Sequence, residues 1–331
     1  MRVTSKSLGG GRVMANNGAV AVVKVATCQF PVSADVDVNR RHILGQLDEA
    51  AQRGARVAHF PEAALSGYAG VDHGGFAGWG TPQWARLREA TREIVARCAR
   101  QGIWTVLGSA HQLSDGRKPH NCLYVISDHG EVVDRYDKRF CAGDAAGTTG
   151  DLAHYSPGDH PVTWEIDSVR CGALICYDYR FPELYRQYVD LGVQLVFHSF
   201  HAGGVPAEQV ALIGAAIGAG LDGVNPAATL TYPGITMPAG MTAAAASNFI
   251  WISCPNTSAP ESLWPAFMVR ADGVTTGRLT RNEPGLLLTT VDTAAPLYDS
   301  TAAWRQRAIS GVLHSGTAVT GDPRSADRTA L

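Results

Sequence analysis

Apolar positions along the chain follow two different spacings, and together these predict an α/β fold. Residues 23–30 form a short apolar run of the kind expected for a strand. The next segment, 39–54, instead places its apolar residues on one face of a helix: Ile43, Leu47, Ala50 and Ala51. Asp37 is the expected N-cap of this helix, and Gly54 is its expected C-terminal stop.

The same alternation of patterns continues to about residue 292. Strand patterns occupy residues 56–62, 103–110, 121–127, 131–138, 162–167, 169–178, 193–200, 249–256, 267–273 and 285–292. Helical patterns occupy residues 82–102, 181–192 and 207–223. A hairpin is expected at Asp167–Ser168. This order predicts a mixed sheet, or two sheets, covered by helices in a layered α/β domain.

No linker or internal repeat divides residues 22–295, so we expect them to form a single domain. Residues 1–21 lack the apolar core of a secretory signal and are expected to be a flexible leader, with Met14 as an alternative start. Residues 296–331 are polar and irregular, with one helical patch at 302–310. We expect them to form a C-terminal extension.

The composition narrows the class of protein. The 331 residues are 45% hydrophobic and 18% charged, with a net charge of −2 and no Lys/Arg stripe, which argues against nucleic-acid binding. Residues 223–260 carry no charge, but prolines interrupt them and leave no apolar span of about 20 residues for a membrane. Seven scattered cysteines without a Cys-x-x-Cys pair favour a reducing, cytoplasmic location over a disulfide scaffold.

Several chemical motifs are missing or weak. Gly-x-Ser-x-Gly, His-Glu-x-x-His and Gly-x-x-x-x-Gly-Lys-Ser/Thr do not occur. The segment GAGLDG (218–223) matches Gly-x-Gly-x-x-Gly, but it ends an Ala-rich helical pattern instead of following a strand, which argues against dinucleotide binding. His198 and His201 have no third metal ligand nearby in the sequence, so a strand end or pocket wall is the favoured reading.

Cys176 stands in ICYDYRFPELYR (175–186), where a strand pattern gives way to a helical one. A free cysteine is most often a small buried filler, and this reading is the better one for the residue alone. The strand–helix junction allows another reading, because N–H groups of the following turn can stabilise a thiolate or an oxyanion. Such a thiol needs a base, since at an ordinary pKa near 8.5 only a few per cent is ionised at pH 7.

Two charged residues elsewhere in the chain are candidates to act with Cys176. Glu62 follows a strand and a proline in HFPEAALSGY, and Lys138 ends the strand pattern EVVDRYDK. Taken singly, the glutamate is typical of a loop and the lysine of a solvated strand end. Neither residue alone indicates a catalytic site.

Taken together, the three stretches resemble the nitrilase superfamily of carbon–nitrogen hydrolases. The blocks AHFPEAALSGY, YDKRF and GALICYDYRFPELYR bring glutamate, lysine and cysteine in that family's order, and the resemblance extends from about residue 23 to 292. It implies a four-layer αββα sandwich and an enzyme without a metal or organic cofactor. It also implies that Glu62 is the general base, Lys138 the electrostatic stabiliser and Cys176 the nucleophile, with the Tyr177 N–H in the oxyanion hole.

The chain departs from the family pattern at a few positions. Many members carry a second glutamate between lysine and cysteine, and here Asp151 occupies that place in GDLAHYSPGD. The lysine block KRFC lacks the usual His-Leu-Phe. The nucleophile is followed by Tyr-Asp instead of the Trp-Glu of true nitrilases, which favours amide or carbamoyl substrates over nitriles. By similarity Arg180 binds a substrate carboxylate or pairs with Glu183. Further pocket-wall candidates are Tyr68, Tyr155, His198 and Phe200.

The resemblance therefore implies hydrolysis of a small amide to a carboxylic acid and ammonia through a cysteine thioester. Alternatives are an N-carbamoyl amino acid amidohydrolase, a nitrilase, or a non-catalytic binding member of the fold. The expected partners are a small amide, carbamoyl or nitrile substrate and further copies of the chain, with neither nucleic acid nor membrane. A homodimer or higher homo-oligomer would pair through the helix after the nucleophile and the C-terminal extension.

Overall fold

Two β-sheets form the centre of the computed structural model, which describes residues 21–114, 116–217 and 231–329. The first sheet has seven strands in the order β10-β1-β2-β3-β4-β5, with β13 also paired to β1. Its strands are β1 (Val22–Phe30), β2 (Val57–His59), β3 (Trp104–His111), β4 (His120–Ile126), β5 (Val132–Asp137), β10 (Asn256–Thr257) and β13 (Gly285–Asp292).

The second sheet has six strands in the order β12-β11-β9-β8-β7-β6. Its strands are β6 (Thr163–Ile166), β7 (Val169–Ile175), β8 (Leu195–Ser199), β9 (Trp251–Cys254), β11 (Phe267–Val269) and β12 (Thr275–Arg278). The β6–β7 hairpin turns at Asp167 and Ser168, as expected from the sequence. Both residues have positive φ (48° and 68°), which suits a tight two-residue turn between twisted strands.

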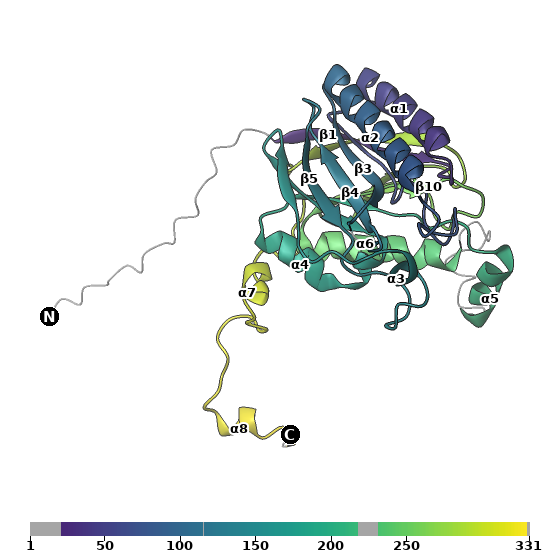
Figure 1. Cartoon of the computed structure of the whole chain (residues 1–331). Helices are drawn as coiled ribbons and strands as arrows, with labels where there is room; N and C mark the ends of the chain where they lie inside the picture. The colour runs from purple at the N-terminus through teal and green to yellow at the C-terminus, as the bar shows by residue number, and fades with distance from the viewer. Residues whose placement is uncertain (1–20, 115, 218–230, 330–331) are drawn as a thin grey trace.

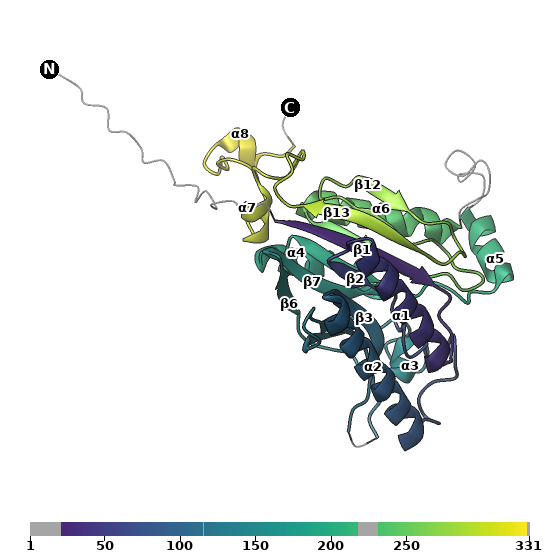
Figure 2. The ribbon, with the colours of Figure 1, turned by 90° about the horizontal axis from the view of Figure 1, so that it is seen from above.

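Helices cover the outer face of each sheet. Helices α1 (Val36–Gln52) and α2 (Thr81–Gln101) pack on the first sheet, and α4 (Pro182–Asp190) and α6 (Tyr232–Asn248) pack on the second. Figure 1 shows the two helix pairs on opposite sides of the strands, and Figure 2 shows the same layers from above. The predicted four-layer αββα sandwich is confirmed.

Strand β1 illustrates how the sequence produces these layers. Its side chains alternate between the two faces of the sheet. Val23 and Val25 join the cluster between the sheets, whereas Ala26, Cys28 and Phe30 join the cluster beneath α1 and α2. Because both faces are covered, the strand is apolar on both, which is why its sequence reads as a continuous run.

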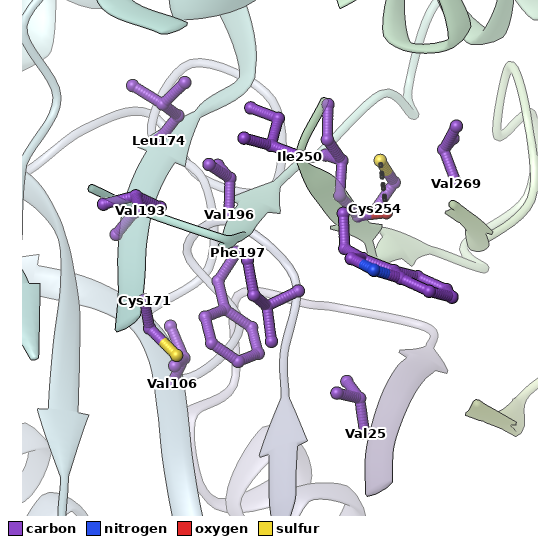
Figure 3. Packing of buried hydrophobic residues seen from close by; sticks show 14 of the residues in the cluster. Val25, Val106, Cys171, Leu174, Val193, Val196, Phe197, Ile250, Cys254 and Val269 are labelled. Carbon is purple, nitrogen blue, oxygen red and sulfur yellow. Dashed lines mark hydrogen bonds between the residues drawn. The ribbon is translucent and has the colours of Figure 1, made fainter. Parts of the chain in front are cut away.

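The cluster between and behind the sheets is shown in Figure 3. Val25 and Val106 belong to the first sheet, and Cys171 and Phe197 belong to the second. All four are at most 1% exposed. Burial of a side chain of valine or phenylalanine size contributes about 1.5–3 kcal/mol, so this contact holds the two sheets in a fixed relation. The sheets in turn fix the relative positions of loops at their edges.

The start of α1 differs from the sequence prediction. The N-cap of α1 is Asp35, whose carboxylate accepts from the N–H groups of Asp37 and Val38. The prediction of Asp37 as N-cap is therefore wrong, because the helix starts two residues earlier and Asp37 pairs with Arg86 instead. Gly54 follows the helix end with φ +74°, as a C-terminal stop requires.

Helix α6 begins directly after Thr231. Thr231 caps it by accepting from the Gly234 N–H, and Pro233 lies in its first turn, where proline is tolerated. The helix continues through Pro238. Within the described part of the chain, no helix is long and apolar enough to cross a membrane.

The remaining helices are short or peripheral. They are α3 (Asp151–His154), the 3₁₀ helix η1 (Cys176–Arg180), α5 (Ala207–Ile217), α7 (Arg305–Ile309) and α8 (Pro323–Ala326). The segment carrying α7 and α8 leaves the layered body in both Figure 1 and Figure 2. Residues 1–20 of the predicted leader and the GAGLDG segment lie outside the described residues. The predicted domain boundaries at 22 and 295 stay a prediction.

Candidate active site

Sheet topology brings the three predicted catalytic residues to the ends of strands. β2 is parallel to β3, and β5 is two antiparallel steps from β3, so β2 and β5 run in the same direction. Glu62 follows β2 and Lys138 follows β5, and both therefore lie at the same edge of the first sheet. Cys176 follows β7 directly in the second sheet.

The turn that carries Glu62 has an unusual backbone. Ala63 has φ +52°, a left-handed conformation that costs a non-glycine residue about 1–3 kcal/mol. Gly108 of β3 lies beneath this turn and accepts from the Leu65 N–H at 2.9 Å. A Cβ on Gly108 would lie 1.9 Å from the Pro61 carbonyl oxygen, so only glycine allows the turn to approach the strand this closely.

The Glu62 carboxylate is fully buried and held at both oxygens. Oε1 accepts from Lys138 Nζ at 2.7 Å and from Asn121 Nδ2 at 2.8 Å. Oε2 accepts from the His201 backbone N–H at 3.0 Å. The backbone N–H of Glu62 donates to the Phe200 carbonyl at 3.2 Å, which ties this turn to the second sheet. These four contacts hold the carboxylate and its turn in one orientation.

Lys138 is fully buried between two carboxylates. Its Nζ lies 2.7 Å from Glu62 Oε1 and 2.7 Å from Asp151 Oδ2. Burial alone would lower the pKa of Lys138, but the charges of Glu62 and Asp151, with a contribution from Tyr68, outweigh it and hold that pKa well above its usual value. Lys138 is therefore an ammonium group at neutral pH.

Asp151 is anchored on its other side. Its Oδ1 accepts from the Tyr68 hydroxyl, and its Oδ2 accepts from the Ala142 N–H at 2.8 Å. The Tyr68 ring lies 5.8 Å from Lys138 Nζ, within reach of a cation–π contact. The structure thus places Asp151 in contact with Lys138. Tyr68, predicted as part of the pocket wall, contacts both Asp151 and Lys138.

Cys176 is partly exposed and has φ +39°, so the second strained residue of the site is the predicted nucleophile itself. Burial of its sulfur and the negative charge of Glu62 raise the pKa of Cys176 well above its usual value, while Lys138 opposes them. The resting sulfur is therefore a thiol close to the Glu62 carboxylate.

Two buried side chains support the cysteine turn from opposite sides. Asp178 Oδ2 accepts from the Ile175 N–H at 2.9 Å and from the Tyr136 hydroxyl at 2.8 Å, and Oδ1 accepts from the Phe140 N–H at 2.9 Å. These bonds connect the Cys176 turn to β5 and to the loop after Lys138. Asp178 therefore fixes the distance between the cysteine and lysine segments.

His198 supports the same turn from β8. Its Nε2 lies 3.1 Å from the Cys176 carbonyl oxygen, and its Nδ1 lies 2.8 Å from the Tyr185 hydroxyl. Burial lowers the pKa of His198 to about 3, so the ring is neutral. With one proton on the ring, Nε2–H donates to the carbonyl and Nδ1 accepts from the tyrosine.

The other predicted residues lie around this centre. Phe200 is fully buried and stacks on His198 at 4.5 Å between ring centroids, and the buried Tyr155 hydroxyl accepts from the Ala69 N–H. Tyr177 is exposed, and its N–H is among the first of η1, which have no partner inside a helix. Arg180 lies 4.6 Å from the Tyr179 ring. Their roles toward substrate stay predictions.

Several groups in this site were missed by sequence reasoning. Asn121 is the second donor to Glu62, and its signal was a polar residue in the otherwise apolar segment 121–127. Asp178 stood in the quoted cysteine block but was used only to compare substrate classes. The backbone N–H of His201 has no sequence signal, because any residue carries one. Among the described residues, no group of three or more His, Cys, Asp and Glu could hold a metal.

Comparison with known proteins gives the family. A model of the carbon–nitrogen hydrolase family matches residues 24–296, which is most of the chain. The chain belongs to the carbon–nitrogen hydrolase family. The order of the glutamate, lysine and cysteine blocks in this carbon–nitrogen hydrolase predicted the family correctly.

The curated relatives match part of this hydrolase. Hydrolase Rv0480c of Mycobacterium tuberculosis is 29% identical over 174 residues, 53% of this chain and 59% of that protein. Deaminated glutathione amidase of Bos taurus is 27% identical over 201 residues, 57% of this chain and 59% of that protein. The chain thus spans about three fifths of the length of these curated relatives.

A solved structure shares the whole fold. An amidase from Nesterenkonia sp. superposes with a TM-score of 0.63 at 22% identity, over 83% of this chain and 94% of that chain. In one mutant of that amidase, the acetamide moiety of fluoroacetamide is covalently added at the active-site cysteine. At this identity the superposition establishes that the two proteins share a fold.

Proposed function

We propose that this carbon–nitrogen hydrolase converts small amides into carboxylic acids and ammonia, with Cys176 as nucleophile, Glu62 as general base and Lys138 as electrostatic stabiliser. The observation that carries the proposal is the contact of Lys138 Nζ with Glu62 Oε1 at 2.7 Å, close enough to Cys176 for the charges of both groups to act on the pKa of its thiol. A buried ion pair beside the sulfur of a partly exposed cysteine can move a proton and bind a developing negative charge.

The first step transfers the thiol proton to Glu62 as sulfur approaches the carbonyl carbon. Before transfer, Glu62, Asp151 and Lys138 together carry one net negative charge beside a neutral thiol. After transfer, Glu62 is neutral and the sulfur carries the charge, so the total is unchanged. Transfer is therefore possible inside a buried site without bringing in a counter-ion.

Attack on the amide carbon places negative charge on the substrate oxygen. The Lys138 ammonium and the Tyr177 N–H are the proposed donors to this oxyanion, and one such donor is typically worth about 3–4 kcal/mol. Asp151 keeps Lys138 charged and in position while Glu62 gains and loses its proton. Asp151 thus serves in place of a second glutamate.

Collapse of the tetrahedral intermediate breaks the carbon–nitrogen bond. Glu62 returns its proton to the nitrogen, ammonia leaves, and the acyl group remains on Cys176 as a thioester. Glu62 then accepts a proton from water, whose oxygen attacks the thioester carbon. Cleavage of the carbon–sulfur bond releases the acid, and the proton held by Glu62 returns to sulfur.

The choice of amide over nitrile is supported by two observations. Tyr177 and Asp178 follow the nucleophile where true nitrilases carry Trp-Glu. A matched curated relative, from Bos taurus, is named an amidase. N-carbamoyl amino acids are the alternative substrates, and Arg180 would then bind their carboxylate, since it is exposed and makes no ion pair with Glu183.

The decisive experiment measures ammonia release from small aliphatic amides, N-carbamoyl amino acids and nitriles. Cys176→Ala should abolish turnover, whereas Cys141→Ala should not, because Cys141 is the other partly exposed cysteine and serves as a matched control. Iodoacetamide should modify Cys176 fastest. Full activity of the Cys176→Ala enzyme would refute the nucleophile, and faster turnover of a nitrile than of its amide would refute the substrate class.

We also propose that two or more copies associate through the exposed face of α4 and the C-terminal extension. This extension leaves the layered body and exposes large apolar side chains, including Tyr298 (80%) and Leu313 (84%). Light scattering after gel filtration should give a multiple of 35.1 kDa for the full chain. A monomer at micromolar concentration would contradict the association.

A further inference from the structure

A closed ring of polar contacts links the general base to a carboxylate outside the predicted catalytic set. Glu62 Oε2 accepts from the His201 backbone N–H, and the imidazole of His201 contacts Asp72. Asp72 in turn accepts from the Tyr68 backbone N–H. The Tyr68 hydroxyl continues the ring to Asp151, which contacts Lys138, and Lys138 returns to Glu62 Oε1. This closed series of contacts thus begins and ends at the two oxygens of the Glu62 carboxylate.

Asp72 closes this ring. Its Oδ2 accepts from the Tyr68 N–H at 2.8 Å and lies 2.9 Å from His201 Nε2. The Asp72 N–H donates to the Tyr68 carbonyl at 2.8 Å, so the loop 68–72 is locked by bonds in both directions. One carboxylate oxygen therefore joins the loop after β2 to the turn after β8.

His201 is fixed on its faces as well as at its edge. Its side chain is fully buried, and its ring stacks on Tyr68 with 5.0 Å between centroids and 20° between planes. The side chain of Asp72 is only 9% exposed. Within the described residues, neither nitrogen of the His201 ring makes a hydrogen bond, so stacking on Tyr68 and the approach of the Asp72 carboxylate set its orientation. The orientation of the ring in turn fixes the backbone N–H that donates to Glu62.

We propose that Asp72 and His201 are positioning residues that hold Glu62 in register with Lys138 and Cys176, acting through the His201 N–H and through Tyr68. This inference rests on the proposed function, because it takes Glu62 as the general base. Neither residue touches the reacting atoms. Their effect is on the orientation of the carboxylate, which must face sulfur in one step and the leaving nitrogen in the next.

The test is a double-mutant cycle on turnover. Asp72→Asn keeps the shape and an acceptor for the Tyr68 N–H but removes the charge beside His201. His201→Phe keeps the buried ring and its stacking on Tyr68 but removes Nε2. Each change should lower kcat about 10-fold and leave KM within about twofold, the scale at which partners of functional groups act. In the double variant, kcat should fall about 10-fold and not 100-fold, because both changes break the same Asp72–His201 contact.

Asp128→Asn is the matched control. Asp128 contacts Arg56 Nη1 at 2.9 Å, the same separation as in the Asp72–His201 pair, but belongs to a different part of the fold. The Asp128→Asn variant should have the kcat of the wild-type enzyme. Thermal unfolding of every variant separates loss of stability from loss of rate.

Two results would overturn the inference: an unchanged kcat for Asp72→Asn, or strictly additive losses in the double variant. A rise in KM at constant kcat would also overturn it, because positioning of a base does not change substrate affinity. Failure of the proposed function is recognised separately. In that case wild-type enzyme releases no ammonia from any amide, or Cys176→Ala retains activity.

Discussion

Asp151 Oδ2 and Lys138 Nζ lie 2.7 Å apart, the same distance that separates this ammonium from Glu62. Lys138 is completely buried, so the two carboxylates together replace the water that a charged lysine would otherwise have. Aspartate reaches the lysine here because it stands in the one-turn helix α3, next to the lysine loop, where the Ala142 N–H and the Tyr68 hydroxyl orient it.

The first prediction concerns this contact. Asp151→Asn should lower kcat by about 10- to 100-fold with little change in KM, because the neutral amide no longer holds the lysine charge in place. Steady-state kinetics on the best amide substrate measure the effect. Asp159→Asn is the control, since Asp159 is an exposed aspartate eight residues further along the chain and pairs with His160. Equal activities of the two variants would contradict the role of Asp151.

The second prediction compares two glycines. Gly108→Ala would place a methyl group 1.9 Å from the Pro61 oxygen, so the turn carrying Glu62 must move. A shift of about 1 Å in a catalytic group can cost about 100-fold in rate, and we expect at least that loss in kcat/KM. Gly45→Ala in α1 meets nothing within 4 Å and should stabilise the fold by about 0.5–1 kcal/mol at full activity. Equal kcat/KM values for Gly108→Ala and Gly45→Ala would disprove the close approach of Gly108 to the Pro61 turn.

The third prediction concerns Asp178. Asp178→Asn replaces one acceptor oxygen by an NH₂ group, which then faces a backbone N–H of Ile175 or Phe140. The buried donor left without a partner should lower the free energy of unfolding by about 1–3 kcal/mol, and the cysteine turn should lose alignment and activity. Urea unfolding and ammonia release measure the two effects. Asp190→Asn, at the exposed end of α4, should change neither.

The fourth prediction concerns acid stability. Burial lowers the pKa of His198 to about 3, whereas an unfolded histidine has a pKa near 6.5. Below pH 6.5 the unfolded chain therefore binds a proton that the folded chain does not. Stability should fall by about 1.4 kcal/mol per pH unit as pH drops from 6.5 toward 3, or about 2 kcal/mol at pH 5.

Urea unfolding at pH 7 and pH 5 measures this dependence. His198→Gln should show a smaller loss between the two pH values, because glutamine does not titrate. His129→Gln should keep the wild-type dependence, since the His129 side chain is 84% exposed. An unchanged pH dependence in His198→Gln would show that this ring is not the source.

The sequence by itself determined the layers and the family. The continuous apolar run of strands such as β1 reflects burial on both faces, and burial is a local property that the side-chain pattern records. The order of Glu62, Lys138 and Cys176 in matching blocks identified the family without a structure. Helix ends were less well determined, because Asp35 and Asp37 are chemically equivalent caps until the preceding loop fixes one of them.

The tertiary structure alone decided how these residues are held. Three distant segments carry these residues: Tyr68 with Asp72, Asp151, and His201. The tertiary fold brings the Tyr68 hydroxyl to Asp151 and the Asp72 carboxylate to the His201 ring, with less than 3 Å between the paired atoms. A polar contact depends on the direction of single bonds, and a backbone N–H such as that of His201 has no signature in the residue type. Sequence therefore predicted the residues to which we assign the chemistry, and the fold determined which other residues contact them.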